Sequence, residues 1–241
     1  MLLKWRRLVL VAPLFLGLAA SWAGRAQGSD APLPEIRSWT LAKRDLEPSP
    51  TRPLAYGLRL ELAMVSGTRW APGLILDSVK RAAKILAQCG IRIELARLHE
   101  FDGPPRYRYL STPDSREFAR RAGLPRPAIF FVDDTRMEPA FEAEAIGRAN
   151  ARSRPEMTDT VWITSGTRDL PVALAHELVH VLANSGDHSS MPDNLMRELT
   201  TPFNTRIARD QCSAIVSTAQ ANGLIDRLPA SDGGRQGRPP P

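Results

Sequence analysis

The sequence predicts an α+β fold in which helices pack on a twisted, mixed and mostly parallel sheet. Several short segments alternate apolar and polar residues, the period of a strand, and the segments between them have helical spacing. Ala128–Val132 is a continuous apolar run, typical of a central strand buried on both faces. With 241 residues, 43% of them hydrophobic and 24% charged, the chain has room for one domain and a targeting segment.

The N-terminus has the pattern of an export signal. Lys4, Arg6 and Arg7 precede the apolar run Leu8–Ala20, and small residues follow at plausible cleavage positions. We predict a signal peptide over residues 1–26 and a secreted or periplasmic protein. The apolar run is shorter than the ~20 residues that a bilayer span needs, so no stable membrane insertion is expected after cleavage. An uncleaved anchor is the alternative.

The charge indicates no acidic partner. The formal net charge is +6, but four positive charges lie in the leader, which leaves +2 for the remainder. The other arginines are scattered among acidic residues and form no stripe, so we expect no nucleic-acid binding. A basic surface-binding protein is therefore the weakest functional alternative.

Ordered structure is expected to begin near Leu54. Residues 27–53 are rich in proline and small polar residues, and we interpret them as a linker or short pro-segment. Alternating apolar residues over Leu54–Met64 predict a half-buried strand. From Gly73 to Gln88 the spacing becomes helical, and Gly90 is placed to stop the helix. The expected core face of this helix consists of Leu74, Val79, Ala82, Ala83 and Leu86.

The middle of the chain is predicted to add strands and a short helix. Ile91–Leu95 alternates like a strand, which should run parallel to the first one because a helix connects the two. A short helix is expected over Ser115–Ala122. Two further strands are expected, an edge strand at Ala145–Asn150 and another strand at Thr160–Thr164.

The next predicted element is a helix over residues 169–184. Thr167 or Asp169 can cap its N-terminus, and Pro171 lies in the first turn, where proline is tolerated. The segment Asn184-Ser185-Gly186 offers a stop.

The C-terminal part is predicted to form a small helical subdomain. Helical spacing over residues 206–224 indicates its helix. The predicted domain then spans residues 54–229. Residues 230–241 are rich in glycine and proline, which predicts a disordered tail.

The chain has two cysteines, Cys89 and Cys212. An exported protein meets oxidising conditions, so the two can form a disulfide. The closed loop would exceed one hundred residues, which is worth roughly 4–5 kcal/mol in the chain-entropy model. Two separate buried thiols are an equally good interpretation.

The residues His176-Glu177-Leu178-Val179-His180 form an H-E-x-x-H segment inside the helix predicted over 169–184. Residues four apart share one face of a helix, so both imidazoles can reach one metal ion. Glu177 lies about 100° round the helix, toward the metal's open position. The segment therefore predicts a Zn²⁺ site with His176 and His180 as ligands. His99 lies apart and is predicted to be structural.

Catalytic zinc prefers three protein ligands and an open position. The candidates for the third ligand are His188, Asp187, Asp193 and Glu198. His188 is favoured because Asn184-Ser185-Gly186 can turn the chain back, since asparagine and glycine tolerate left-handed backbone angles. Glu198 is the runner-up, at a spacing that gluzincin-like peptidases use for a glutamate on a second helix. Pro192 and Pro202 leave little room for that helix.

The whole segment resembles the signature of the metzincin clan of zinc endopeptidases, H-E-x-x-H-x-x-G-x-x-H followed by a methionine-containing turn. Residues 187–196 are similar to the stretch from the third histidine to the Met-turn in the matrixin branch. The resemblance implies a role for each residue of the motif. It makes His176, His180 and His188 the zinc ligands, Glu177 the general base and Met196 the residue of the Met-turn.

The metzincin resemblance also implies that an edge strand lines the cleft and binds substrate. The matching residues here are Ala145, Ile146, Gly147 and Arg148. The sequence departs from the clan's pattern in four respects. Ala183 replaces the glycine, His188 comes two residues late, no tyrosine follows Met196, and residues 27–53 contain no cysteine for a latency switch.

The predicted function is that of a secreted zinc endopeptidase that hydrolyses peptide bonds through a zinc-bound water, with Glu177 as general base. Neutral imidazole ligands let the ion lower the pKa of its water from 15.7 toward ~7. An extended protein or peptide substrate would pair with the edge strand. The alternative is a zinc-stabilised binding domain without catalysis. Glu177 argues against it, because structural sites usually fill all four positions with protein ligands. We make no prediction about calcium or oligomeric state.

Overall fold

The computed structural model describes residues 31–46, 53–135, 145–148 and 155–229. The predicted signal peptide and C-terminal tail lie outside this part, as do Ala149 and Asn150 of the predicted edge strand. The helices are α1 (Pro72–Leu86), α2 (Thr112–Ala122), α3 (Leu170–Ala183) and α4 (Arg209–Ala221). Short 3-10 turns are η1 (Lys43–Asp45), η2 (Ala87–Cys89), η3 (Pro105–Arg108) and η4 (Pro155–Met157). Within these residues, no helix has the length and apolar character to cross a membrane.

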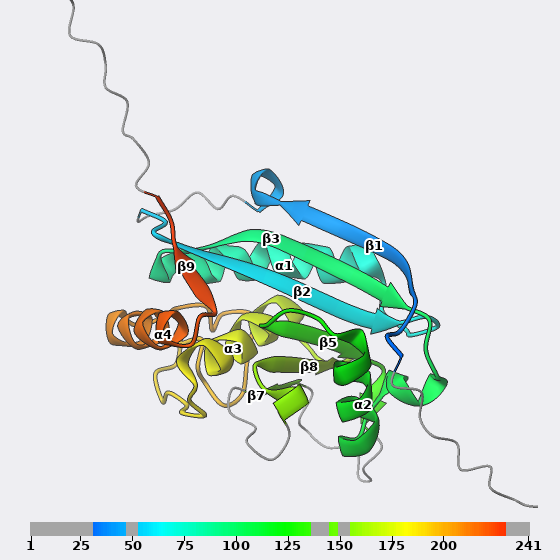
Figure 1. Ribbon diagram of the computed structural model, residues 1–241. Helices are drawn as coiled ribbons and strands as arrows, with labels where there is room; N and C mark the ends of the chain where they lie inside the picture. Colours follow the sequence, from blue (N-terminus) through cyan, green and yellow to red (C-terminus); the bar gives the residue numbers. More distant parts are fainter. Residues whose placement is uncertain (1–30, 47–52, 136–144, 149–154, 230–241) are drawn as a thin grey trace, which may run out of the picture. The chain divides into compact units, whose positions relative to one another are not determined.

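A mixed sheet with the strand order β1-β3-β2-β5-β8-β7 lies at the centre (Figure 1). Its strands are β1 (Glu35–Ala42), β2 (Tyr56–Val65), β3 (Ile91–Phe101), β5 (Ala128–Val132), β7 (Ala145–Arg148), β8 (Thr160–Thr164) and β9 (Ile225–Arg227). The short strands β4 (Tyr109–Leu110) and β6 (Asp134–Thr135) form a separate pair. The α+β class and the mixed sheet are thus as predicted.

The parallel strands occupy the centre of the sheet. Neighbouring strands run parallel from β3 through β2 and β5 to β8, whereas β1 and β7 at the two edges run antiparallel to their partners. The C-terminal part differs from the expected helical subdomain. After α4 the chain returns to the sheet, where β9 pairs antiparallel with the beginning of β2.

The helix α1 connects β2 to β3, so the predicted parallel pair is confirmed. Gly90 ends this connection with a left-handed φ of 72°. Two details of the prediction were wrong. β2 is buried almost throughout, because it has a neighbouring strand on each side and helices on both faces. Leu74 is 54% exposed, and Ile75 takes its place in the buried stripe with Val79 and Leu86.

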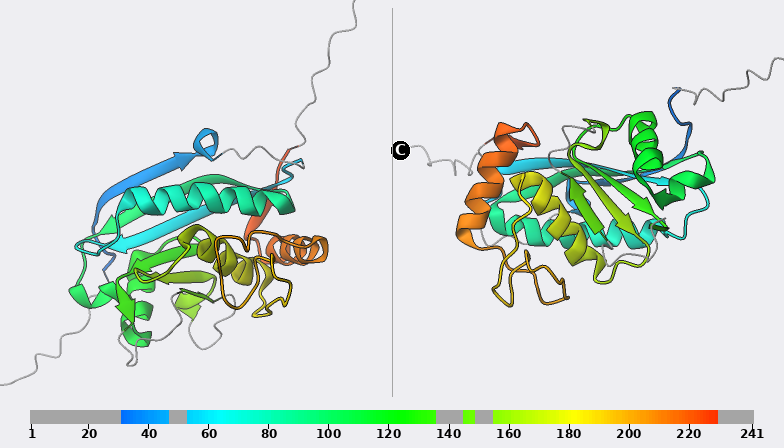
Figure 2. Two further views of the ribbon diagram at one scale, coloured as in Figure 1. Left: turned by 180° about the vertical axis from the view of Figure 1, so that it is seen from behind. Right: turned by 90° about the horizontal axis from the view of Figure 1, so that it is seen from below.

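Helices cover the two faces of the sheet in separate layers (Figures 1 and 2). Successive strand side chains point to opposite faces, so Ile129 and Phe131 pack with α1, α3 and α4, while Phe130 and Val132 pack with α2. All five residues of β5 are buried, as predicted for a central strand. The larger of the two cores lies between the sheet and α3, which carries the H-E-x-x-H segment.

The sheet begins earlier than the expected start near Leu54. β1 lies inside the segment that we interpreted as a linker or short pro-segment, and it pairs along its length with β3. Most of its residues are exposed, and only Trp39 and Leu41 reach the core. An exposed edge strand carries little of the apolar alternation on which a sequence-based prediction depends.

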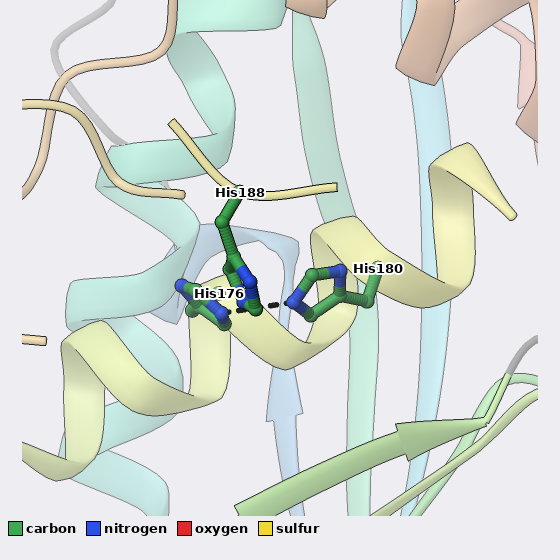
Figure 3. Close-up of side chains that lie close together, drawn as sticks. All are labelled: His176, His180 and His188. Atoms are coloured by element: carbon green, nitrogen blue, oxygen red, sulfur yellow. Dashed lines mark hydrogen bonds between the residues drawn. The ribbon is translucent and has the colours of Figure 1, made fainter. Parts of the chain in front are cut away.

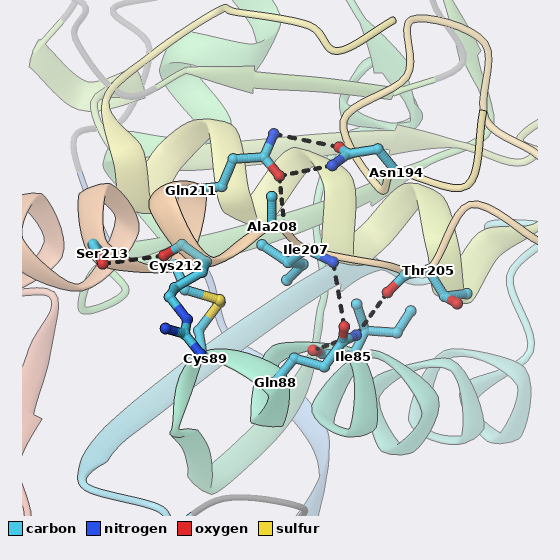
Figure 4. The surroundings of a disulfide bond; sticks show 11 residues. Ile85, Gln88, Cys89, Asn194, Thr205, Ile207, Ala208, Gln211, Cys212 and Ser213 are labelled. Carbon is cyan, nitrogen blue, oxygen red and sulfur yellow. Dashed lines mark hydrogen bonds between the residues drawn. A yellow bond between two sulfur atoms is a disulfide. The ribbon is translucent and has the colours of Figure 1, made fainter. Parts of the chain in front are cut away.

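A disulfide joins Cys89 in η2 to Cys212 in α4, so the paired alternative is correct (Figure 4). The two cysteines are 123 residues apart. Closing a loop of that length stabilises the fold by roughly 4–5 kcal/mol in the chain-entropy model. Disulfides persist in oxidising compartments, which makes this bond compatible with an extracellular protein.

Candidate metal centre

The H-E-x-x-H segment lies in α3, the predicted helix. Pro171 occupies the first turn, where its missing N–H costs no hydrogen bond. Asp169 is the N-cap residue, but its side chain makes no capping hydrogen bond. Its main-chain carbonyl instead accepts from the N–H groups of Val172 and Ala173. The end is as predicted, because Asn184 adopts a left-handed φ of 47° and turns the chain away.

Three imidazoles come together at this helix (Figure 3). His176 and His180 lie one turn apart on α3, and their Nε2 atoms are 2.9 Å apart. The ring of His188 enters from the following loop, with its centroid 5.3 Å from that of His176 and 5.0 Å from that of His180. One nitrogen of each ring lies within 4.8 Å of the others, so the group can hold a metal ion.

Main-chain carbonyls accept hydrogen bonds from the Nδ1 atoms of two of the three rings. His176 Nδ1 lies 2.8 Å from the Leu195 carbonyl oxygen, and His180 Nδ1 lies 2.7 Å from the Ser185 carbonyl oxygen. A carbonyl can only accept, so each Nδ1 carries the proton and each Nε2 presents a lone pair. This is the arrangement by which outer partners orient metal-ligating histidines. Two lone pairs at 2.9 Å repel each other unless a cation lies between them.

Both helix histidines are held in the neutral form. The pKa of His176 falls to about 4, mainly because the ring is buried. The neighbouring imidazoles of His180 and His188 add to this lowering, and the hydrogen bond to the Leu195 carbonyl opposes it. Burial likewise lowers the pKa of His180. A histidine must be deprotonated to bind a metal, so these rings need lose no proton near neutral pH.

The third imidazole is supplied by a loop and is exposed. Ser185 N donates back to the carbonyl of His180, which completes the turn begun at Asn184. Beyond His188, Ser189 N donates to the Met196 carbonyl at 2.7 Å. The loop is thus pinned directly after its histidine.

The other predicted ligands are not part of the histidine group. The Asp187 carboxylate accepts from Ser185 Oγ, and Asp193 pairs with Arg206. Glu198 is exposed and lies in a bend outside any helix. This agrees with the expectation that Pro192 and Pro202 leave little room for a second helix there. Of the described His, Cys, Asp and Glu residues, only the three histidines form such a group.

The other predicted site residues lie on α3, in the larger core and on a strand that contacts α3. Glu177 is half-buried on α3 between the two histidines. Met196 is 4% exposed and belongs to the larger core. The strand Ala145–Arg148 is β7, an edge strand as predicted, and it lies against α3. The roles of Glu177, Met196 and β7 stay predictions.

Several residues that build the site were missed from the sequence. The carbonyls of Leu195 and Ser185 orient two rings, and a main-chain atom leaves no signal in the residue type. The side chains of Asn194 and Gln211 form a pair beside Leu195. Their amide type alone could not identify them, because amides are common in loops and at helix starts.

The donor set fits zinc. Neutral imidazole is a common zinc ligand, and three protein ligands are the number that catalytic zinc sites use. Comparison with known proteins finds neither a family model nor a curated protein that matches the chain.

Proposed function

We propose that the protein is a zinc-dependent endopeptidase of metzincin type, exported to an oxidising compartment. The observation that carries the proposal is the group of three imidazoles, two of them with Nδ1 committed to carbonyls and Nε2 turned to a shared point. Within the described residues this group has three protein ligands and no fourth, which favours a catalytic over a structural zinc site.

In the proposed hydrolysis, three histidines hold the metal ion and one glutamate transfers the proton. His176, His180 and His188 hold the ion. When bound, zinc polarises the scissile carbonyl and makes water a better nucleophile near neutral pH. Glu177 follows His176 directly in α3, and its carboxylate accepts a proton from the attacking water and passes it to the leaving amine. A positioned acid–base group of this kind contributes about 10²–10⁴ in rate.

β7 is the candidate substrate-binding strand. It pairs with β8 along one edge, and no described strand pairs with the other edge. An unpaired strand edge presents N–H and C=O groups to which an extended peptide can add as a further strand. The proximity of β7 to α3 brings such a peptide toward the histidines.

The test combines metal analysis with peptide cleavage by the full chain. We expect about one zinc per chain, cleavage of a mixed peptide library, and loss of cleavage on chelation that added Zn²⁺ restores. Glu177→Gln should keep the zinc and lower cleavage about 10²–10⁴-fold. Glu198→Gln, at an exposed carboxylate of the neighbouring loop, is the matched control and should cleave normally.

Normal cleavage by Glu177→Gln would refute the proposed base. Zinc binding without any cleavage would favour the alternative, a zinc-stabilised binding domain. Loss of zinc from Glu198→Gln rather than from His188→Ala would move the protein to the gluzincin-like ligand set.

A further inference from the structure

The peptide group between Leu195 and Met196 is the outer support of His176. Its C=O accepts from His176 Nδ1 at 2.8 Å, and its N–H donates to Asn194 Oδ1 at 2.8 Å. A peptide group is planar, with C=O and N–H pointing in opposite directions. Holding the N–H therefore fixes the direction of the carbonyl, and the carbonyl fixes the imidazole.

Asn194 is itself firmly held. Its side chain is buried, with the residue 1% exposed. Its Nδ2 donates to Gln211 Oε1 at 2.8 Å, and Gln211 Nε2 donates back to Asn194 Oδ1 at 3.3 Å (Figure 4). Gln211 Oε1 also accepts from the N–H of Ala208 at the start of α4. The next residue is Cys212, which the disulfide joins to η2, so the amide pair is anchored on a cross-linked helix.

The contacts form one directed chain of hydrogen bonds. It runs from His176 Nδ1–H to the Leu195 carbonyl, from the Met196 N–H to Asn194 Oδ1, and from Asn194 Nδ2–H to Gln211 Oε1. Successive amides in such a chain polarise one another. Polarisation increases the acceptor strength of the Leu195 carbonyl, and a stronger acceptor at Nδ1 raises the basicity of the metal-facing Nε2.

The same segment also supports the third ligand. The carbonyl of Met196 accepts from the N–H of Ser189, the residue directly after His188, at 2.7 Å. Displacing the peptide between Leu195 and Met196 would therefore disturb the helix ligand and the loop ligand together.

We infer that Asn194 and Gln211 are positioning residues of the metal centre. They act through the peptide group at Leu195 and set the orientation and basicity of His176. The inference rests on the proposed metal centre, but not on peptide hydrolysis, so it is tested by metal binding.

The experiment measures the Zn²⁺ affinity of the full chain by competition with a chelating indicator, and the visible spectrum after Co²⁺ substitution. Asn194→Ala removes the hydrogen bonds of the Asn194 side chain to the Met196 N–H and to the Gln211 amide. Gln211→Met keeps the length of the side chain and a good helix former while removing its hydrogen bonds. The matched control is Asn204→Ala. Asn204 is a 2% exposed amide of the same loop, and it bonds Pro192 and Thr201 instead.

We expect Asn194→Ala to raise the Zn²⁺ dissociation constant about 10–100-fold, the usual effect of losing an outer-shell partner. Gln211→Met should have a smaller effect in the same direction, and Gln211→Glu, which keeps the accepting Oε1, should recover part of it. Both Asn194→Ala and Gln211→Met should shift the Co²⁺ absorption bands. Asn204→Ala should lose stability while its affinity and spectrum stay those of the wild type.

Equal losses of affinity in Asn194→Ala and Asn204→Ala would overturn the inference, because they would reflect a loosened loop and not a specific support. Unchanged affinity in Asn194→Ala and Gln211→Met would overturn it too, while leaving the proposed function intact. If Asn194→Ala does not fold, Gln211→Met decides by the same criterion. Failure of the wild type to bind Zn²⁺ would refute the metal centre itself.

Discussion

Two histidine clusters in this protein have opposite chemistry. In the first, His176, His180 and His188 face one another, and the second nitrogens of the helix pair bond main-chain carbonyls. In the second, both nitrogens of His99 bond carboxylates. Nδ1 lies 2.6 Å from Glu35 Oε2, and Nε2 lies 2.8 Å from Glu61 Oε2.

The partners decide the charge of each cluster. Burial disfavours a charged His99, but the hydrogen bonds that its ring donates to Glu61 and Glu35 outweigh burial and raise the pKa of His99. At His176 the hydrogen bond to the Leu195 carbonyl does not outweigh burial, and the pKa falls to about 4. Acidic partners thus favour the charged form of a buried histidine, which here cross-links β1, β3 and β2. Carbonyl and imidazole partners favour the neutral form, which can bind a cation.

Replacing one histidine of each cluster by alanine should give the largest difference between the clusters in zinc binding and stability. His180→Ala should abolish stoichiometric zinc binding, an effect beyond the about 10–100-fold typical of outer-shell partners. His99→Ala should keep full zinc occupancy but destabilise the fold by about 3 kcal/mol, because it leaves the buried Glu61 without its partner. Metal analysis and urea unfolding of both variants measure the two effects.

The variant His188→Ala tests whether His188 is the third ligand. It should lower zinc occupancy far more than Glu198→Ala, because the Glu198 carboxylate lies outside the histidine group. The reverse ranking would contradict the ligand set, and loss of zinc from His99→Ala would remove the distinction between the clusters.

Removal of the disulfide should affect the metal centre and the His99 cluster differently. Replacing both Cys89 and Cys212 by serine should lower the free energy of unfolding by roughly 4–5 kcal/mol. The bond anchors α4, which supports the metal-site loop through Gln211. Zinc affinity should therefore fall as well, while hydrogen exchange in β1, held by His99, should keep its protection relative to the rest of the sheet. Denaturant unfolding and exchange measured on the same variant test this, and faster relative exchange in β1 would contradict it.

The pH dependence of the metal-free protein should have opposite signs at the two clusters. The folded-state pKa of His176 lies below its ordinary value of 6.5, so the unfolded chain binds the proton more readily between the two values. Stability should rise with pH across about pH 4 to 6.5, by up to about 3 kcal/mol. The pKa of His99 is raised, so its contribution is complete below 6.5 and is lost as pH rises through the folded-state value.

Unfolding curves of His176→Gln and His99→Gln, compared with the wild type over this range, separate the two contributions. In His176→Gln the free energy of unfolding should rise less between about pH 4 and 6.5. In His99→Gln it should fall less toward higher pH. Identical pH profiles in all three proteins would show that neither histidine shifts its pKa on folding.

The smallest effect is expected at the outer partner of His99. The hydrogen bond from His99 lowers the pKa of Glu35, so its contribution is present above about pH 4.5 and is lost as pH falls through the folded-state value. The Glu35 side chain is 42% exposed, and solvent screens its interaction. Glu35→Gln should therefore cost no more than about 1 kcal/mol near neutral pH, measured by urea unfolding. A larger loss would mean that β1 depends on this contact more than its exposure indicates.

Local patterns in the sequence determined most of the secondary structure and part of the site. The strand–helix–strand unit from Tyr56 to Phe101, the buried strand β5 and helix α3 all follow from apolar spacing. His176 and His180 follow from helical geometry, because four residues make about one turn. His188 could be favoured because the asparagine and glycine before it permit a chain reversal.

Only the tertiary structure decided the elements that depend on distant partners. The exposed strand β1, the return of β9 to β2 and the pairing of Cys89 with Cys212 have no local pattern. The same holds for the Leu195 carbonyl and for the Asn194–Gln211 pair. The sequence encodes helices and strands through periodic side chains. The orientation of a ligand depends on main-chain atoms and long-range contacts, which exist only once the chain has folded.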